Sequence, residues 1–230
     1  MRFLKSSGDT QQKMEEFNLQ PSFDAQAENF IDECQAVTQA LANIHETLTV
    51  TLFVDVILAS NSKVQHLSAY SPKNAINSAW QYNITTFLRE KLAGLHWTLI
   101  DGKGGVAYIL SPCKKHAIRV LSGNRYVGLK DGLASNNCLK GTTLSNDIYV
   151  PSMSFENNTQ IWTLLFYKEP QKEVMRLELS RPNALDKGKI VDWHTRIKIP
   201  HINFHLPDKP LKNIEKAEVG TVPVRRKKAS

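Results

Sequence analysis

The stretch WTLIDGKGGVAYIL, residues 97–110, decides the fold prediction, because the pattern of the chain changes there from helical to extended. One apolar run ends at Asp101, a glycine-rich segment follows, and a second apolar run begins at Val106. A glycine-rich segment between two short apolar runs is what the turn of a β-hairpin requires. Similar short runs follow at residues 116–121, 125–129, 161–167 and 174–180. The second half of the chain therefore predicts an antiparallel meander.

Two helical patterns precede this stretch. Within residues 22–48, apolar side chains recur at spacings of four and three, which places them on one face of a helix. A second helix is predicted between Ser71 and Gly94, with Pro72 at its first turn. We interpret the apolar run at residues 49–59 as a buried strand. The prediction is an α+β fold, in which two N-terminal helices pack on a mainly antiparallel, twisted β-sheet of about six to eight strands.

The two ends of the chain are polar and lack periodicity. We expect a flexible N-terminal arm at residues 1–20, a single α+β domain at 21–206 and a basic disordered tail at 207–230. The first residues contain no apolar segment typical of a secretory signal, and no run is long enough to span a bilayer. The cysteines form no paired motif, which favours a cytoplasmic protein; they are Cys34, Cys113 and Cys138. Because no run can span a bilayer, we expect no membrane contact.

The positive charge is unevenly distributed. The net charge is +7, and residues 102–146 carry seven basic side chains against one acidic one. A concentrated basic surface favours a polyanionic partner, above all nucleic acid. The alternative is a solvated surface, or one that pairs with an acidic protein or with the acidic N-terminal segment of the same chain. The predicted nucleic-acid contacts are Lys114, Lys115, Arg119, Arg125, Lys130 and Lys140.

The glycine-rich segment matches neither of the common phosphate-binding loops, because it lacks the spacing of a P-loop and position 107 is alanine where a dinucleotide fingerprint has its third glycine.

Asp101 and Lys103 have the acid-x-lysine spacing of a metal-dependent nuclease. This arrangement resembles the scheme of restriction enzymes. With Glu178 they would form a catalytic site in which Asp101 and Glu178 hold Mg²⁺. The alternative for Glu178 is a cross-strand ion pair with a lysine or arginine.

Three functions remain open from the sequence. The first is a cytosolic polyanion-binding protein that binds nucleic acid through residues 102–146 and the C-terminal tail. The second is a magnesium-dependent nuclease or toxin-like enzyme acting on nucleic acid. The third is an interaction module that forms a homodimer, or binds another protein, through the helix at residues 22–48.

Overall fold

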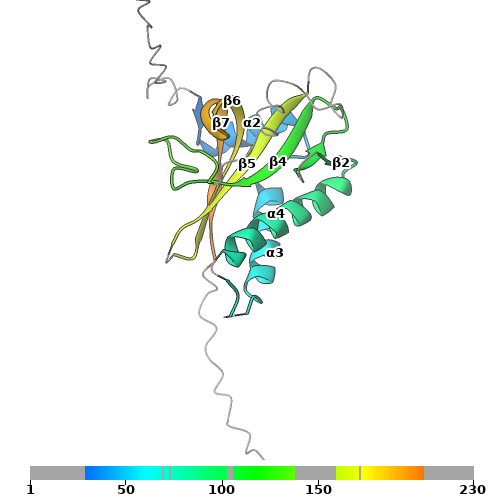
Figure 1. Ribbon diagram of the computed structural model, residues 1–230. Helices are drawn as coiled ribbons and strands as arrows, with labels where there is room; N and C mark the ends of the chain where they lie inside the picture. Colours follow the sequence, from blue (N-terminus) through cyan, green and yellow to red (C-terminus); the bar gives the residue numbers. More distant parts are fainter. Residues whose placement is uncertain are drawn as a thin grey trace, which may run out of the picture.

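The structure, a computed structural model, describes residues 29–204 apart from 69, 73, 103–105, 138–158 and 171. Its three helices are α2 (Cys34–Ile44), α3 (Val50–Val64) and α4 (Ala75–Ala93). Its strands are β1 (Phe30–Ile31), β2 (Thr98–Asp101), β3 (Ala107–Leu110), β4 (His116–Ser122), β5 (Gln160–Lys168), β6 (Val174–Asp186) and β7 (Lys189–Asn203). They form one sheet in the order β1-β7-β6-β5-β4-β3-β2 (Figure 1).

The sheet is mixed, with antiparallel pairing as the dominant form. Strands β2, β3 and β4 form an antiparallel meander, and β5, β6 and β7 form a second one. The two meanders are joined by the parallel pair β4–β5, and β1 adds a parallel edge to β7. The predicted α+β class, with N-terminal helices packed on a mainly antiparallel sheet, is confirmed.

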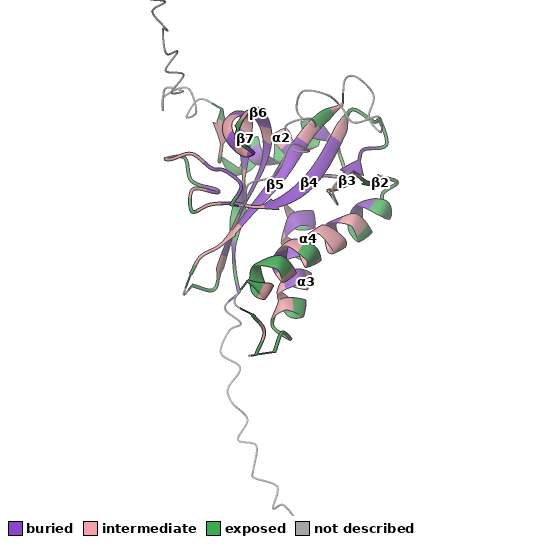
Figure 2. Ribbon diagram, in the orientation of Figure 1, coloured by how far each residue is buried: buried purple, intermediate pink, exposed green. Residues whose placement is uncertain are grey.

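All three helices lie on one face of the sheet and bury one side each against it (Figures 1 and 2). In α4 the buried residues recur every four positions, so they form a single stripe. The stripe consists of Trp80, Ile84, Leu88 and Leu92. The helix predicted within residues 22–48 is wrong at Phe30–Ile31, which pair with β7 as strand β1. In α2 the apolar seam is buried in the same core, at Val37, Leu41 and Ile44. That seam is therefore already covered by the protein's own sheet and helices.

The prediction of a strand at residues 49–59 is wrong, because this run lies in helix α3. It is apolar on nearly every side, and periodicity alone cannot separate such a run from a buried strand. Thr49 starts the helix by accepting a hydrogen bond from the backbone N–H of Leu52 at 3.1 Å. Burial on the helical spacing of Phe53, Val56 and Ile57 outweighs the preference of the β-branched residues for strands. The described residues thus place three helices on the sheet where the sequence predicted two.

The second face of the sheet is partly covered by a loop, residues 123–137, which leaves the end of β4 (green, at the left of Figure 1). A parallel pair such as β4–β5 needs a long crossover connection, and this loop is its described part. The predicted strand at residues 125–129 is wrong, because residues 125–128 form a turn within the loop. A second apolar cluster lies beneath the loop, formed by Leu121, Val127, Ala134, Leu165, Ile190 and Trp193.

Strand β7 continues through Pro200. Leu177 pairs with Ile199 and Met175 pairs with Ile202, so Pro200 and His201 together oppose the single residue Arg176. This two-against-one arrangement is a β-bulge, where a proline is tolerated because the ladder is already interrupted. The bulge shifts the phase of the strand, so that His201 shares a face with Lys198. Across the described residues, no helix combines the length and apolar character needed to cross a membrane.

Candidate functional site

The structure separates the carboxylates of the predicted nuclease site. Asp101 ends the edge strand β2, while Glu178 lies on β6, with β3, β4 and β5 between them. At about 4.8 Å per strand, the two strands are about 19 Å apart. The two side chains also face opposite sides of the sheet, since Asp101 pairs with Arg89 of helix α4 and Glu178 lies under the loop. One Mg²⁺ ion cannot bind both, and Lys103 lies outside the described residues.

Asp101 forms an exposed ion pair. Arg89 Nη1 donates to Asp101 Oδ1 at 2.6 Å, joining α4 to the edge of the sheet. This hydrogen bond, together with the charge of the guanidinium, lowers the pKa of the Asp101 carboxyl. In the described parts of the chain, no group of three or more His, Cys, Asp or Glu side chains is arranged to hold a metal ion.

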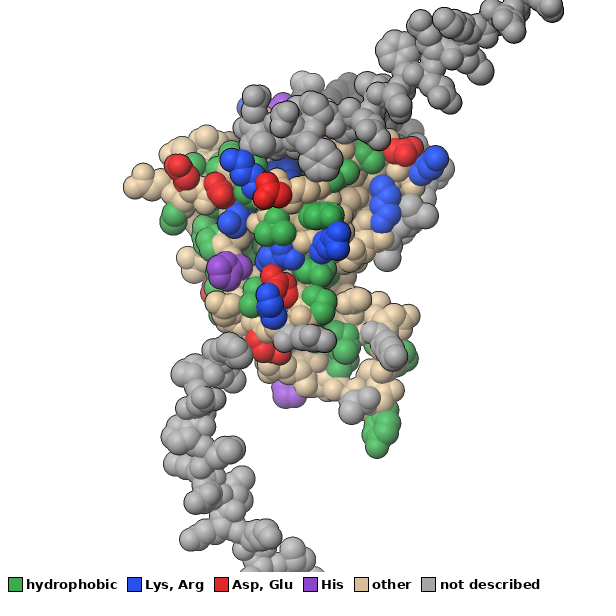
Figure 3. Space-filling model, turned by 90° about the vertical axis from the view of Figure 1, so that its left-hand side faces the viewer, with side chains coloured by type: hydrophobic (Ala, Val, Ile, Leu, Met, Phe, Trp, Pro, Cys, Tyr) green, Lys and Arg blue, Asp and Glu red, His purple; other side chains and the backbone are tan. Residues whose placement is uncertain are grey.

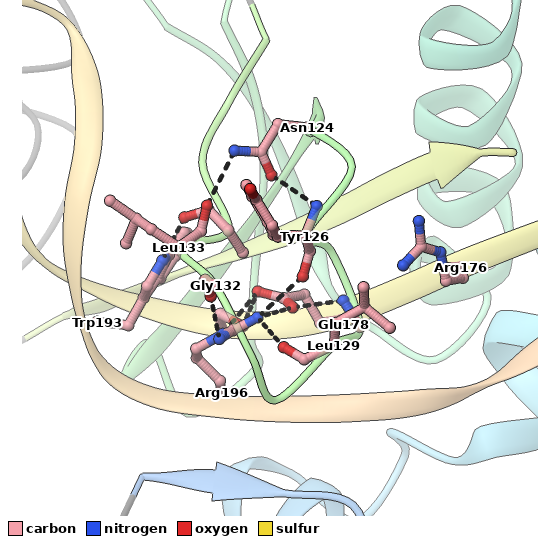
Figure 4. Close-up of polar contacts among 12 residues, drawn as sticks. Asn124, Tyr126, Leu129, Gly132, Leu133, Arg176, Glu178, Trp193 and Arg196 are labelled. Atoms are coloured by element: carbon pink, nitrogen blue, oxygen red, sulfur yellow. Dashed lines mark hydrogen bonds and ion pairs between the residues drawn. The ribbon is translucent and has the colours of Figure 1, made fainter. Parts of the chain in front are cut away.

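Glu178 forms a buried ion pair with Arg196 of β7 (Figure 4). Arg196 Nη2 lies 2.8 Å from Glu178 Oε2, which also accepts the backbone N–H of Gly128 at 2.7 Å. Glu178 Oε1 accepts the hydroxyl of Ser180 at 3.0 Å. Both carboxylate oxygens therefore have donors from the protein itself, as a buried charge requires. The cross-strand ion pair expected as the alternative for Glu178 is what forms.

The same ion pair holds the loop against the sheet. Arg196 donates to the backbone carbonyls of Tyr126, Leu129 and Gly132 at 3.0–3.4 Å (Figure 4). The indole N–H of Trp193 donates to the carbonyl of Ala134 at 2.8 Å. Because loop carbonyls are satisfied by side chains from β7, the loop is fixed in position without regular secondary structure.

The predicted nucleic-acid contacts fall into two exposed groups and one buried residue. Lys114 and Lys115 are exposed at the turn before β4, and Arg125 and Lys130 are exposed on the loop after it. The seven residues of β4 separate the two groups by about 20 Å. Arg119 is buried, and its Nε donates to Thr163 at 3.0 Å, so it cannot serve as a surface phosphate contact. Lys140 lies outside the described residues.

A groove lies beside the loop on this second face of the sheet. Its floor is the β6–β7 pair, and its walls are the loop at Gly128–Leu129 and the β5–β6 turn. The cavity measures about 320 Å³. Its charged and titratable lining side chains are Glu169, Lys172, Arg176, Lys198 and His201. Figure 3 views the side of the molecule on which the loop lies and shows Lys and Arg side chains there, interspersed with acidic ones.

Ion pairs with Glu169 position two of the basic groups of the groove. Glu169 lies 2.9 Å from Lys172 Nζ and 3.1 Å from Arg176 Nε, so one carboxylate holds two cations in place. The hydrogen bond from Lys172 is the main reason why the pKa of Glu169 is lowered. Lys198 has no ion pair with any described residue, because Glu178, directly opposite it on β6, is occupied by Arg196. The groove residues and the loop residues Arg125, Lys130 and Asp131 form one surface. Its described residues include five basic groups and two acidic ones.

Sequence reasoning did not identify Lys172, Lys198 and His201 as groove residues. One signal was present: in IKIPHINF, residues 197–204, the apolar side chains change from odd to even positions across Pro200. That change of phase is the pattern of a β-bulge, and bulges are common next to functional sites. The register between β6 and β7, which brings Arg176 near Lys198, has no local signal in the sequence.

The chain was compared with protein-family models, with curated proteins and with solved structures, and no match was found in any of the three comparisons.

Proposed function

We propose that this protein binds nucleic acid through the groove and the adjoining loop. The observation that carries the proposal is Lys198, a cation with no ion pair among the described residues, in a groove that it shares with Lys172 and Arg176. Among the described residues that line the groove, Glu169 is the one acidic side chain. A cluster of fixed cations around a hollow attracts phosphate groups, because it concentrates positive potential at one place.

The rigidity of the loop supports the same proposal. Arg125 and Lys130 stand on a segment whose carbonyls are held by Arg196 and Trp193. Cations that are already positioned lose less conformational freedom when a ligand binds. The exposed pair Lys114–Lys115 lies about 20 Å from the loop, which about six nucleotides would span at 3.4 Å each. We propose that it is a second phosphate contact on a longer ligand, and that Lys140 and the basic tail contribute further charge.

A salt titration tests the proposal. A fluorescent 20-nucleotide strand is titrated with protein at several salt concentrations, and affinity is followed by anisotropy. For a phosphate-binding surface, affinity falls as salt rises, with a log–log slope of about −0.7 to −0.9 per phosphate contact. The variant Lys198→Ala should bind several-fold more weakly and should reduce the steepness of that slope by about one contact.

The matched control is Lys63→Ala, which removes an exposed lysine from the end of helix α3, on the opposite face of the sheet. It should bind like the unmodified protein. Affinity that does not depend on salt, or equal losses in both variants, would overturn the proposal. Parallel samples with Mg²⁺ test the nuclease alternative: cleavage products that disappear in Asp101→Ala would support it.

A further inference from the structure

Two arginine–tyrosine stacks lie next to the groove and are joined to each other. The guanidinium of Arg125 lies 4.9 Å from the ring centre of Tyr126, and its Nη2 donates to the hydroxyl of Tyr126 at 2.8 Å. The guanidinium of Arg176 lies 4.9 Å from the ring centre of Tyr167. Arg176 Nη2 also donates to the carbonyl of Arg125 at 2.8 Å, which links the stacks. Two flat cations are therefore held beside a basic groove.

The exposure of Arg125 leaves its guanidinium accessible to a further ring. Gly132 lies against the Tyr126 ring, since an added Cβ there would come within 2.2 Å of the ring. Arg125 itself is exposed. Guanidinium planes and aromatic rings are the surfaces on which unpaired bases stack in proteins that bind single strands. A base stacked on Arg125 would add to the contact that Arg125 already makes with Tyr126.

The surroundings of the groove suit a single strand better than a duplex. Proteins that read duplex DNA commonly place a helix in the major groove, which is about 12 Å wide. In the described structure, all three helices lie on the other face of the sheet, and the basic surface is built from strands and a loop. The cavity volume of about 320 Å³ is at the small end of the range for ligand sites. A flexible single strand can enter a cavity of this size.

We infer that the groove binds single-stranded nucleic acid without sequence preference, with Lys198 and Arg176 contacting the phosphate backbone and Arg125 stacking on a base. This inference rests on the proposed function and specifies the form of its ligand. Backbone charge supplies the salt-dependent part of the affinity, and stacking supplies a part that needs bases but tolerates any of them.

The test compares three labelled 20-unit probes at one salt concentration: a mixed-sequence single strand, the same sequence as a duplex, and an abasic strand with the same backbone charge. The single strand should bind at least about fivefold more tightly than the abasic strand, which is the range expected for one stacked base. It should also bind more tightly than the duplex. Arg125→Lys keeps the charge and loses the plane, so it should weaken single-strand binding while leaving the abasic strand and the salt slope unchanged.

The control is Lys63→Arg, which keeps the charge of an exposed residue on the opposite face of the sheet and should bind all three probes normally. Equal affinity for the single strand and the abasic strand, or tighter binding of the duplex, would overturn the inference and leave the proposed function standing, provided that binding still depends on Lys198. Failure of all three probes to bind would remove the proposed function, and the inference with it.

Discussion

Arg196 and Glu178 form an ion pair that is completely enclosed between the sheet and the loop, with Arg196 Nη2 2.8 Å from Glu178 Oε2 (Figure 4). Their positions on β7 and β6 are diagonal, since Arg196 pairs in register with Ser180 and Glu178 with Lys198. The pair links strands β6 and β7 to the backbone of the loop that forms one wall of the groove. Stability and the proposed binding surface therefore depend on the same two residues.

Removing one partner of this pair should strongly destabilise the protein. We expect Glu178→Gln and Arg196→Met each to lower the free energy of unfolding by about 3–5 kcal/mol, because the remaining polar group stays buried without its counter-charge. Urea denaturation followed by tryptophan fluorescence measures the loss. Lys91→Met, which removes an exposed ion pair with Asp55 at 3.6 Å, is the control and should cost less than about 1 kcal/mol. Similar small losses in all three variants would contradict this account.

Gly132 should tolerate no side chain. Its φ is +94°, and a Cβ would come within 2.2 Å of the Tyr126 ring, so we expect Gly132→Ala to destabilise the fold by about 1–3 kcal/mol. The control is Gly94→Ala at the end of helix α4, where φ is −62° and the nearest atom to a new Cβ is at 3.4 Å. That change should be neutral or slightly stabilising. Thermal unfolding of both variants separates the two, and an equal effect would show that the loop adapts freely.

The ion pair between Arg89 and Asp101 should be visible in an acid titration. Arg89 lowers the folded-state pKa of Asp101, so Arg89→Gln should raise it toward its usual value, as measured by NMR of the carboxyl carbon. Because the folded pKa is the lower one, the pair stabilises the protein above the unfolded pKa of the aspartate. That contribution is lost as pH falls through the folded pKa. Arg125→Gln is the control and should leave the pKa of Asp101 unchanged. An equal shift of that pKa in both variants, or no shift in Arg89→Gln, would rule out the ion pair.

Thr49 should act as a helix cap, which it could not do in a strand. We expect Thr49→Ala to lower the free energy of unfolding by about 1 kcal/mol, because the N–H of Leu52 loses its acceptor. Thr51→Ala, at an exposed position two residues later within α3, is the control. It should have little effect or slightly increase helix stability. If both threonines behave alike in chemical denaturation, the capping role is wrong.

Patterns that repeat within one element were predicted well from the sequence. The alternation in VMRLELS, residues 174–180, places Met175, Leu177 and Leu179 on one face, and all three are buried in the helix-side core. The helix ending before Gly94 was also correct. These features depend on side chains two to four residues apart, and their geometry is set by the backbone itself.

The candidate site could be predicted only in part. Arg125 and Lys130 were identified from charge and are exposed, whereas Arg119 carries the same charge and is buried against Thr163. Charge does not indicate which face of a strand a residue occupies when both faces are covered. When helices cover one face of a sheet and a loop covers the other, the sequence pattern does not show on which face an arginine is buried.

The sequence by itself determined the α+β class, the positions of strands β2 to β6 and the concentration of basic residues after Asp101, because these follow from local periodicity and composition. Only the tertiary structure decided that residues 49–59 are helical, that Glu178 pairs with Arg196, and that Lys198 and Arg176 share a groove. Those outcomes depend on strand register, a bulge at Pro200 and a long crossover loop. Each of them brings together residues far apart in the chain, and no local pattern specifies which of the possible pairings buries the most apolar surface while satisfying the buried charges.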